Sequence, residues 1–162
     1  LVTDAYKKAP PPVKGQPVLP KFLIDWASLD LYGKNIIVLS GGLRGEISYK
    51  ILSGEEAEAA QIAKKFQKRF GSDFYLELQD NGLPEQEHVN EVLYSWVEKH
   101  GMQVVGTCEA HYLKPEDAEP HEILQCIENG RNLDLDRPKS LVPPEYYLKP
   151  ASLMIERFSR YA

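Results

Sequence analysis

Three short segments of the chain have the hydrophobic pattern of β-strands. Residues 36–39 form a continuous apolar run before a glycine turn, which predicts a strand buried on both faces. Apolar side chains occupy every second position from residue 74 to residue 79, so this strand should bury one face. Residues 103–107 form the third predicted strand, and residues 108–113 continue past its end. A further short strand is predicted at residues 146–148.

Longer segments with helical periodicity separate and follow these strands. Apolar positions recur at helical spacing over residues 55–70, and Gly71 is placed to end this helix. A second helix is predicted from Pro84 to about residue 99, because proline is favoured at the first helical position. Residues 115–127 and residues 151–161 are predicted to form two more helices. The alternating order of strands and helices predicts an α/β fold with a mainly parallel sheet, open or closed into a barrel.

The start of the chain does not follow this alternating order. A helical pattern at residues 1–9 is followed by a proline-rich loop at residues 10–20 and a short predicted helix at residues 22–26. The helical pattern begins abruptly at Leu1, so we expect the chain to be part of something longer. We therefore treat residues 1–33 as a lead-in segment to the main domain.

Composition and charge narrow the class of protein. With 162 residues, of which 43% are hydrophobic and 27% charged, the chain can form one globular domain with a core. Its net charge of −5 argues against a free-standing domain that clamps a nucleic-acid backbone. No apolar run is long enough to span a membrane and no signal peptide is recognisable, so we expect a soluble, cytoplasmic protein without a membrane partner. Cys108 and Cys126 are expected to be free thiols.

Three side chains are candidates for a metal site at the carboxyl ends of the strands. Glu109 and His111 follow the third strand two positions apart, so a continuing strand would place them on one face. Glu77 lies near the end of the preceding strand, where a carboxylate is costly to bury without a partner. Carboxylate and imidazole together suit zinc, manganese or iron. The simpler alternative is a surface carboxylate beside a histidine that bonds nearby backbone.

A glycine-rich turn at residues 40–46 is a weaker candidate. Backbone amides in such a turn can bind an anion, but the spacing matches neither a nucleotide-triphosphate loop nor a dinucleotide fingerprint. Glycines that permit a sharp turn are the more economical interpretation. His88 and His100 are expected to face solvent, and His121 to lie in a helix.

Five blocks in this order resemble the polymerase-and-histidinol-phosphatase (PHP) domain of the bacterial DNA polymerase III alpha subunit. They are residues 37–46 (IVLSGGLRGE), 74–86 (with FYLELQ and GLPEQ), 107–122 (beginning TCEAHYLKPEDA), 133–137 and 145–148. The resemblance covers residues 34 to 158, which places residues 34–162 in the carboxyl-terminal half of a PHP-like domain. It implies an α/β fold that is part of a distorted seven-stranded (β/α) barrel. Half a barrel would leave unpaired sheet edges.

The resemblance also implies a metal cluster of zinc or manganese at the carboxyl rim, where Glu77, Glu109 and His111 fall. Relatives with an intact site usually have cysteine where this chain has Gly42, and many have histidine where it has Asn81. Both substitutions remove a ligand. Glu109 replaces an aspartate and reaches further by one methylene. The paired histidines that open the family's site belong to the first half of the domain.

The resemblance implies that this chain is a fragment of a polymerase subunit and acts mainly as a structural and partner-binding module in DNA replication. Its partners would be the remainder of the subunit, the proofreading exonuclease subunit, and DNA through the parent protein. Nucleotidyl transfer by the DNA-directed DNA polymerase, with magnesium, would reside outside this chain, so the fragment alone should be inactive. The alternatives are a metal-dependent phosphoesterase or 3'-5' proofreading exonuclease site, the PHP domain of an error-prone polymerase paralogue, and an unrelated α/β binding domain.

Overall fold

The structure is a computed structural model that describes residues 24–128, 130 and 144–161, together with Thr3, Ala5 and Lys7. The chain divides into two compact units, residues 1–37 and residues 38–162. None of the helices in the described ranges combines the length and the apolar character needed to cross a membrane.

In the first unit, helix α2 spans Trp26–Tyr32. The Asp25 carboxylate accepts hydrogen bonds from the backbone amide of Ser28 at 2.8 Å and from its hydroxyl at 2.7 Å. This N-cap starts the helix at Trp26, so the prediction of a helix at residues 22–26 was wrong in its position. Of the predicted helix at residues 1–9, the three described residues are helical, whereas the predicted loop at residues 10–20 lies outside the described residues.

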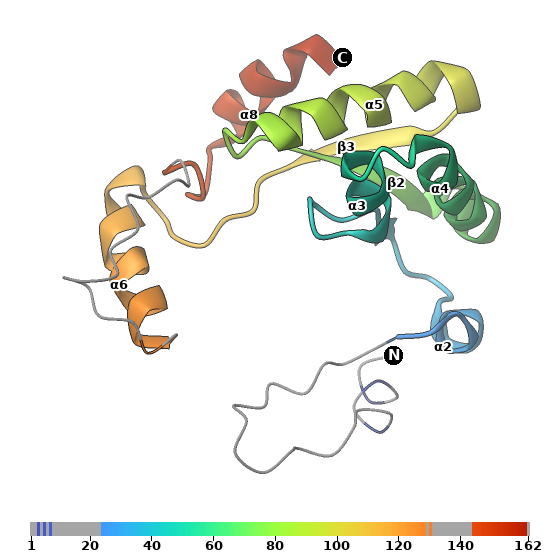
Figure 1. The fold of residues 1–162 in the computed structure, drawn as a ribbon, viewed down its shortest axis with the longest axis horizontal. Coiled ribbons are helices and arrows are strands. Elements are labelled where there is room, and N and C mark those ends of the chain that lie inside the picture. The colour runs from blue at the N-terminus through green and yellow to red at the C-terminus, as the bar shows by residue number, and fades with distance from the viewer. Residues whose placement is uncertain are drawn as a thin grey trace. The chain divides into compact units, whose positions relative to one another are not determined.

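The second unit contains a parallel sheet of three strands in the order β1-β2-β3. Strands β2 and β3 lie side by side in Figure 1. The strands are β1 (Val38–Leu39), β2 (Phe74–Gln79) and β3 (Gln103–Thr107). Phe74 pairs with Val38, and Gln79 pairs with Thr107. The prediction of a parallel α/β arrangement is therefore confirmed, and β2 and β3 have the predicted bounds.

Helices cover one face of this sheet. They are α3 (Glu46–Leu52), α4 (Glu56–Phe70), α5 (Pro84–His100) and α8 (Ala151–Phe158), the last followed by a 3₁₀ turn at Ser159–Tyr161. Phe74, Leu76 and Leu78 of β2 are buried beneath them, as the alternation predicted. Burial of such side chains contributes roughly 1.5–3 kcal/mol each, so this layer supplies much of the stability of the unit.

Three residues on the helices, Phe66, Trp96 and Phe158, show how the helices pack on the sheet. The rings of Phe66 in α4 and Phe74 in β2 stack with centroids 5.5 Å apart. Trp96 of α5 is 1% exposed and belongs to the same core. A Cβ atom at Gly106 in β3 would lie 2.8 Å from the Phe158 ring of α8, so glycine at this position allows α8 to approach the sheet.

Strand β1 differs from its prediction. Only two residues of the apolar run form a strand, and Ile37 and Leu39 are 69% and 41% exposed, so the expected burial on both faces was wrong. The physical reason is position, because β1 is an edge strand of the described sheet and pairs only with β2. Helix α3, which follows the glycine turn, was not predicted.

The remaining predictions concern the carboxyl-terminal part of the chain. The predicted helix at residues 115–127 is confirmed as a 3₁₀ turn at Pro115–Asp117 followed by α6 (Ala118–Glu128). The short strand expected at residues 146–148 is reduced to a single parallel bridge between Tyr112 and Tyr147. Both cysteines are free, as expected.

Candidate functional site

Polar side chains connect the carboxyl ends of all three strands. The backbone amide of Glu77 donates to Ser40 Oγ at 2.8 Å, which links β2 to the end of β1. Thr107 Oγ1, at the end of β3, donates to Glu77 Oε1 at 2.6 Å. Gln79 Nε2 donates to the same oxygen at 3.0 Å. The half-buried Glu77 carboxylate is therefore stabilised by two neutral donors.

The glycine turn after β1 lies directly against this polar cluster. Gly41 adopts a positive φ of 81°, and the amide of Gly45 donates to the carbonyl of Gly42 at 2.8 Å. A Cβ atom at Gly42 would lie 2.5 Å from Gln79 Oε1. Any side chain at position 42 would therefore have to displace the Gln79 carboxamide, whose far end is flexible enough to move.

The end of β2 is also held to helix α5 by buried amides. Asn90 Nδ2 donates to the carbonyl of Gln79 at 2.7 Å, and the amide of Gln79 donates to Asn90 Oδ1 at 3.3 Å. Gln86 Nε2 donates to the same Asn90 oxygen at 2.9 Å. Buried amides of this kind fix the backbone because an unpaired group would cost about 1–3 kcal/mol.

Glu109 and His111 do come together, although not by the expected route. Residues 108–110 are not part of a strand. The backbone amide of Ala110 donates a hydrogen bond to the carbonyl of Cys108 at 3.0 Å, which closes a tight turn. His111 Nε2 lies 3.4 Å from Glu109 Oε1, with the two side chains 44% and 49% exposed. A turn, rather than strand alternation, therefore produces the pair.

His111 is oriented by a segment that is distant in sequence. Its backbone amide donates to the carbonyl of Tyr146 at 2.7 Å, and its ring centroid lies 5.4 Å from the Tyr146 ring. The ring of His121, in α6, lies 5.3 Å from the His111 ring. Burial raises the pKa of Tyr146, and the nearby charge of Glu109 raises it further, so its hydroxyl stays neutral at physiological pH.

Glu77 is not brought together with this pair into one metal site. Within the residues that the structure describes, no group of three or more His, Cys, Asp or Glu side chains is arranged to hold a metal ion. The carboxylate of Glu77 instead bonds to Thr107 and Gln79. A site with all three predicted ligands stays a prediction.

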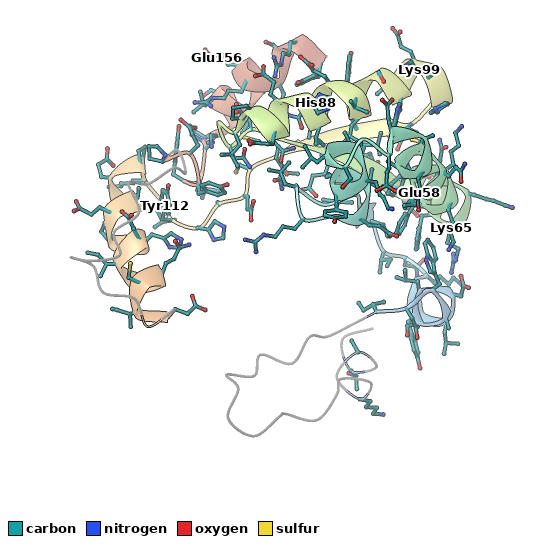
Figure 2. The ribbon with its side chains drawn as sticks, in the orientation of Figure 1. Glu58, Lys65, His88, Lys99, Tyr112 and Glu156 are labelled. Carbon is teal, nitrogen blue, oxygen red and sulfur yellow. The ribbon has the colours of Figure 1, made fainter. Side chains whose placement is uncertain are left out.

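The other histidines agree largely with expectation. His88 is exposed on α5 (Figure 2). His121 lies in α6, with its Nε2 atom 3.1 Å from Gln125 Nε2. His100 is half-buried, with its ring 6.4 Å from Trp96, and so it is less open to solvent than predicted.

A cleft of about 450 Å³ lies between the loop after β2, the start of α5 and helix α8. Its lining includes Asn81, Gln86 and Arg157, but neither Glu109 nor His111. The Glu109–His111 pair therefore lies outside this cleft. Because acidic and basic side chains line the cleft together, its chemistry favours no single class of ligand, and the chemical case for a site rests on the pair.

Sequence reasoning missed the residues that support this pair. Tyr146 supplies the carbonyl that holds His111, and Tyr112 forms the bridge with Tyr147. The sequence held part of this signal, because residues 145–148 form one of the five blocks that resemble the PHP domain and a short strand is predicted at residues 146–148. Their partner was not evident, because it lies more than thirty positions earlier in the chain.

Comparison with known proteins adds independent information. Residues 1–81 match the family described as the PHP domain, and this match includes the lead-in segment. The chain is 33% identical to the DNA polymerase III subunit alpha of Caulobacter vibrioides over 87% of its own length, and 34% identical to that of Aquifex aeolicus over 78%. It is 36% identical to an error-prone DNA polymerase of Symbiobacterium thermophilum over 78% of its length. The chain spans only 12% of the length of each of these relatives.

Proposed function

This chain belongs to the PHP domain family, and on that premise we propose that it is a segment of the alpha subunit of a bacterial DNA polymerase III, acting mainly as a structural and partner-binding module. The observation that carries this proposal is the similarity over 87% of the chain to a replicative alpha subunit. The remainder of the subunit completes the seven-stranded barrel and supplies the DNA-directed DNA polymerase activity with magnesium. The parent protein acts on DNA in the cytoplasm.

The chemistry of the rim bears on whether this segment could hold a metal ion by itself. Zinc sites in proteins use at least three protein ligands. Of the three predicted ligands, Glu109 and His111 lie together, and the described residues contain no group of three or more potential ligands arranged to hold a metal ion. Gly42 offers no side chain, and Asn81 is 3% exposed with its Oδ1 accepting from the amide of Leu83 at 3.3 Å. Glu109 and His111 fit part of a zinc or manganese site, which would supply Lewis-acid chemistry if upstream residues of the parent completed it.

Two alternatives draw on specific observations. The paired and well-oriented His111 favours a metal-dependent phosphoesterase or 3'-5' proofreading exonuclease site. The 36% identity to an error-prone polymerase favours the PHP domain of that paralogue, which the downstream sequence of the parent would decide.

Metal content and phosphatase activity of the full-length parent test the main proposal. We expect less than one zinc or manganese ion per chain and no phosphatase activity above that of His111→Ala. The matched control is His88→Ala, which removes an exposed histidine from α5. Stoichiometric metal together with activity that is lost in His111→Ala and kept in His88→Ala would instead establish a working phosphoesterase.

Partner binding is tested separately with the purified exonuclease subunit of the same organism. We expect the full-length parent to co-elute with it on size exclusion, and a parent lacking the PHP domain to elute alone. Co-elution that persists without the PHP domain would contradict the partner-binding role.

A further inference from the structure

The loop that carries His111 is held by the backbone of residues 145–148. The carbonyl of Tyr146 accepts hydrogen bonds from the amides of His111 at 2.7 Å and Tyr112 at 3.3 Å. The amide of Leu148 donates to the carbonyl of Tyr112 at 2.9 Å. The position of the His111 backbone therefore depends on whatever fixes residues 145–148.

Charged side chains fix both ends of that segment. The Lys149 side chain is completely buried, with Nζ 3.4 Å from Glu145 Oε2 and 4.6 Å from the centre of the Tyr147 ring. Lys149 Nζ also donates to the carbonyl of Glu145. A buried ammonium group is costly without such partners, so this lysine ties the two ends of the segment together.

Arg157 of α8 connects this segment to the sheet. Its Nη1 atom lies 3.2 Å from Glu145 Oε2 and 3.0 Å from Asp80 Oδ2, and Asp80 directly follows β2. The three side chains are only 24–29% exposed, so solvent screens their attraction less than at an open surface. Asp80, Arg157, Glu145 and Lys149 form a continuous chain of charges from the end of β2 to the segment that holds His111.

We propose that Arg157 and Glu145 are positioning residues for the Glu109–His111 pair. They act through the backbone of residues 145–148 and contact neither member of the pair. Any effect of Arg157 on metal binding rests on the proposed metal role of the pair, whereas its effect on the His111 backbone does not. Helix α8 therefore controls the geometry of a rim that it does not line.

Hydrogen exchange of the full-length parent measures this effect directly. In Arg157→Met, exchange of the His111 and Tyr112 amides should be faster by about tenfold, as local opening becomes easier. Amides of β2 should exchange as in the parent. Arg157→Lys should restore part of the protection, because lysine keeps the charge but not the forked geometry.

The matched control is Arg160→Met. Arg160 lies three positions later and pairs with Glu87 at 2.9 Å, so this change removes the same charge without touching residues 145–148. Equal effects of the two substitutions on His111 and Tyr112 would overturn the proposal.

Glu145→Gln provides a second test that keeps the side-chain volume. If Arg157→Met also speeds the exchange of the β2 amides, its effect on His111 is not specific, and Glu145→Gln then tests the proposal. Unchanged protection of the His111 amide in Glu145→Gln would overturn the proposal. Zinc titration of the same variants separates the positioning role of Arg157 from the proposed metal role of the Glu109–His111 pair. Absence of zinc binding by the parent would refute the metal alternative, while the exchange result would still decide the role of Arg157.

Discussion

Glu77 places a carboxylate at a half-buried position of the central strand, and its neighbours show how that charge is accommodated. Thr107 and Gln79 donate hydrogen bonds to one carboxylate oxygen, and Ser40 accepts from the Glu77 amide. Hydrogen bonds to ionised groups contribute roughly 1.5–3 kcal/mol when buried, and less at this partial exposure. Glu77 therefore links the carboxyl ends of the three strands through hydrogen bonds of its backbone amide and its carboxylate.

The substitution Thr107→Val tests this role at the residue scale. Loss of the 2.6 Å hydrogen bond should destabilise the sheet end by about 1 kcal/mol. Hydrogen exchange of residues 74–79 and 103–107 in the full-length parent should then be about fivefold faster. Thr107→Ser, which keeps the hydroxyl, should exchange like the parent. Unchanged exchange in Thr107→Val would show that the hydroxyl adds nothing to the strand pairing.

At the scale of elements, helix α8 and the 3₁₀ turn at Ser159–Tyr161 that follows it are held against the sheet and α5 by contacts of different kinds. The Phe158 ring fits over Gly106, the Tyr161 ring lies 5.0 Å from Tyr94, and Arg160 pairs with Glu87. Burial raises the pKa of Tyr161, so its hydroxyl stays neutral in this contact. The helix thus combines close packing with charge pairing, and the packing sets its distance from β3.

The substitution Gly106→Ala tests that packing. The added Cβ would lie 2.8 Å from the Phe158 ring and should cost about 1–3 kcal/mol through overpacking. We expect faster hydrogen exchange in residues 151–161 of the full-length parent. In a Phe158→Ala background, where the ring is absent, adding Gly106→Ala should increase hydrogen exchange less than it does in the unchanged protein. Additive effects of the two changes would contradict a direct clash.

At the scale of the whole molecule, the three-stranded sheet has an exposed edge within the described residues. Leu39 of β1 is 41% exposed, and Ile37 directly before the strand is 69% exposed. A sheet edge of this kind is a template for pairing with further strands. The chain also spans only 12% of the length of relatives such as the Caulobacter alpha subunit. Both observations fit a unit that is completed by other parts of the parent.

The stability of the isolated chain tests this expectation. Thermal unfolding of residues 1–162 followed by circular dichroism should be broad and accompanied by association, because the β1 edge is unprotected. The same residues in the full-length parent should be protected from hydrogen exchange. A sharp, cooperative and concentration-independent transition of the isolated chain would contradict the prediction.

The sequence by itself determined the elements whose signal is local. Strands β2 and β3 and helices α4, α5 and α6 lie where periodicity, proline and glycine placed them, because these patterns report the conformation of contiguous residues. The parallel order followed from their alternation. The five blocks between residues 37 and 148 together resembled the PHP domain, and the independent match over residues 1–81 shows that family.

Only the tertiary structure decided which side chains meet. The Thr107 hydroxyl reaches Glu77 across thirty positions, and Arg157 reaches Asp80 across seventy-seven. Such pairs depend on how whole elements pack, and no local pattern encodes them. The same reasoning explains why β1 was expected to be buried but is exposed, since burial depends on which neighbours a strand acquires. Glu109 and His111 lie close together, whereas their role as metal ligands stays a prediction. The carbonyl of Tyr146 that orients His111 became visible only once the chain was folded.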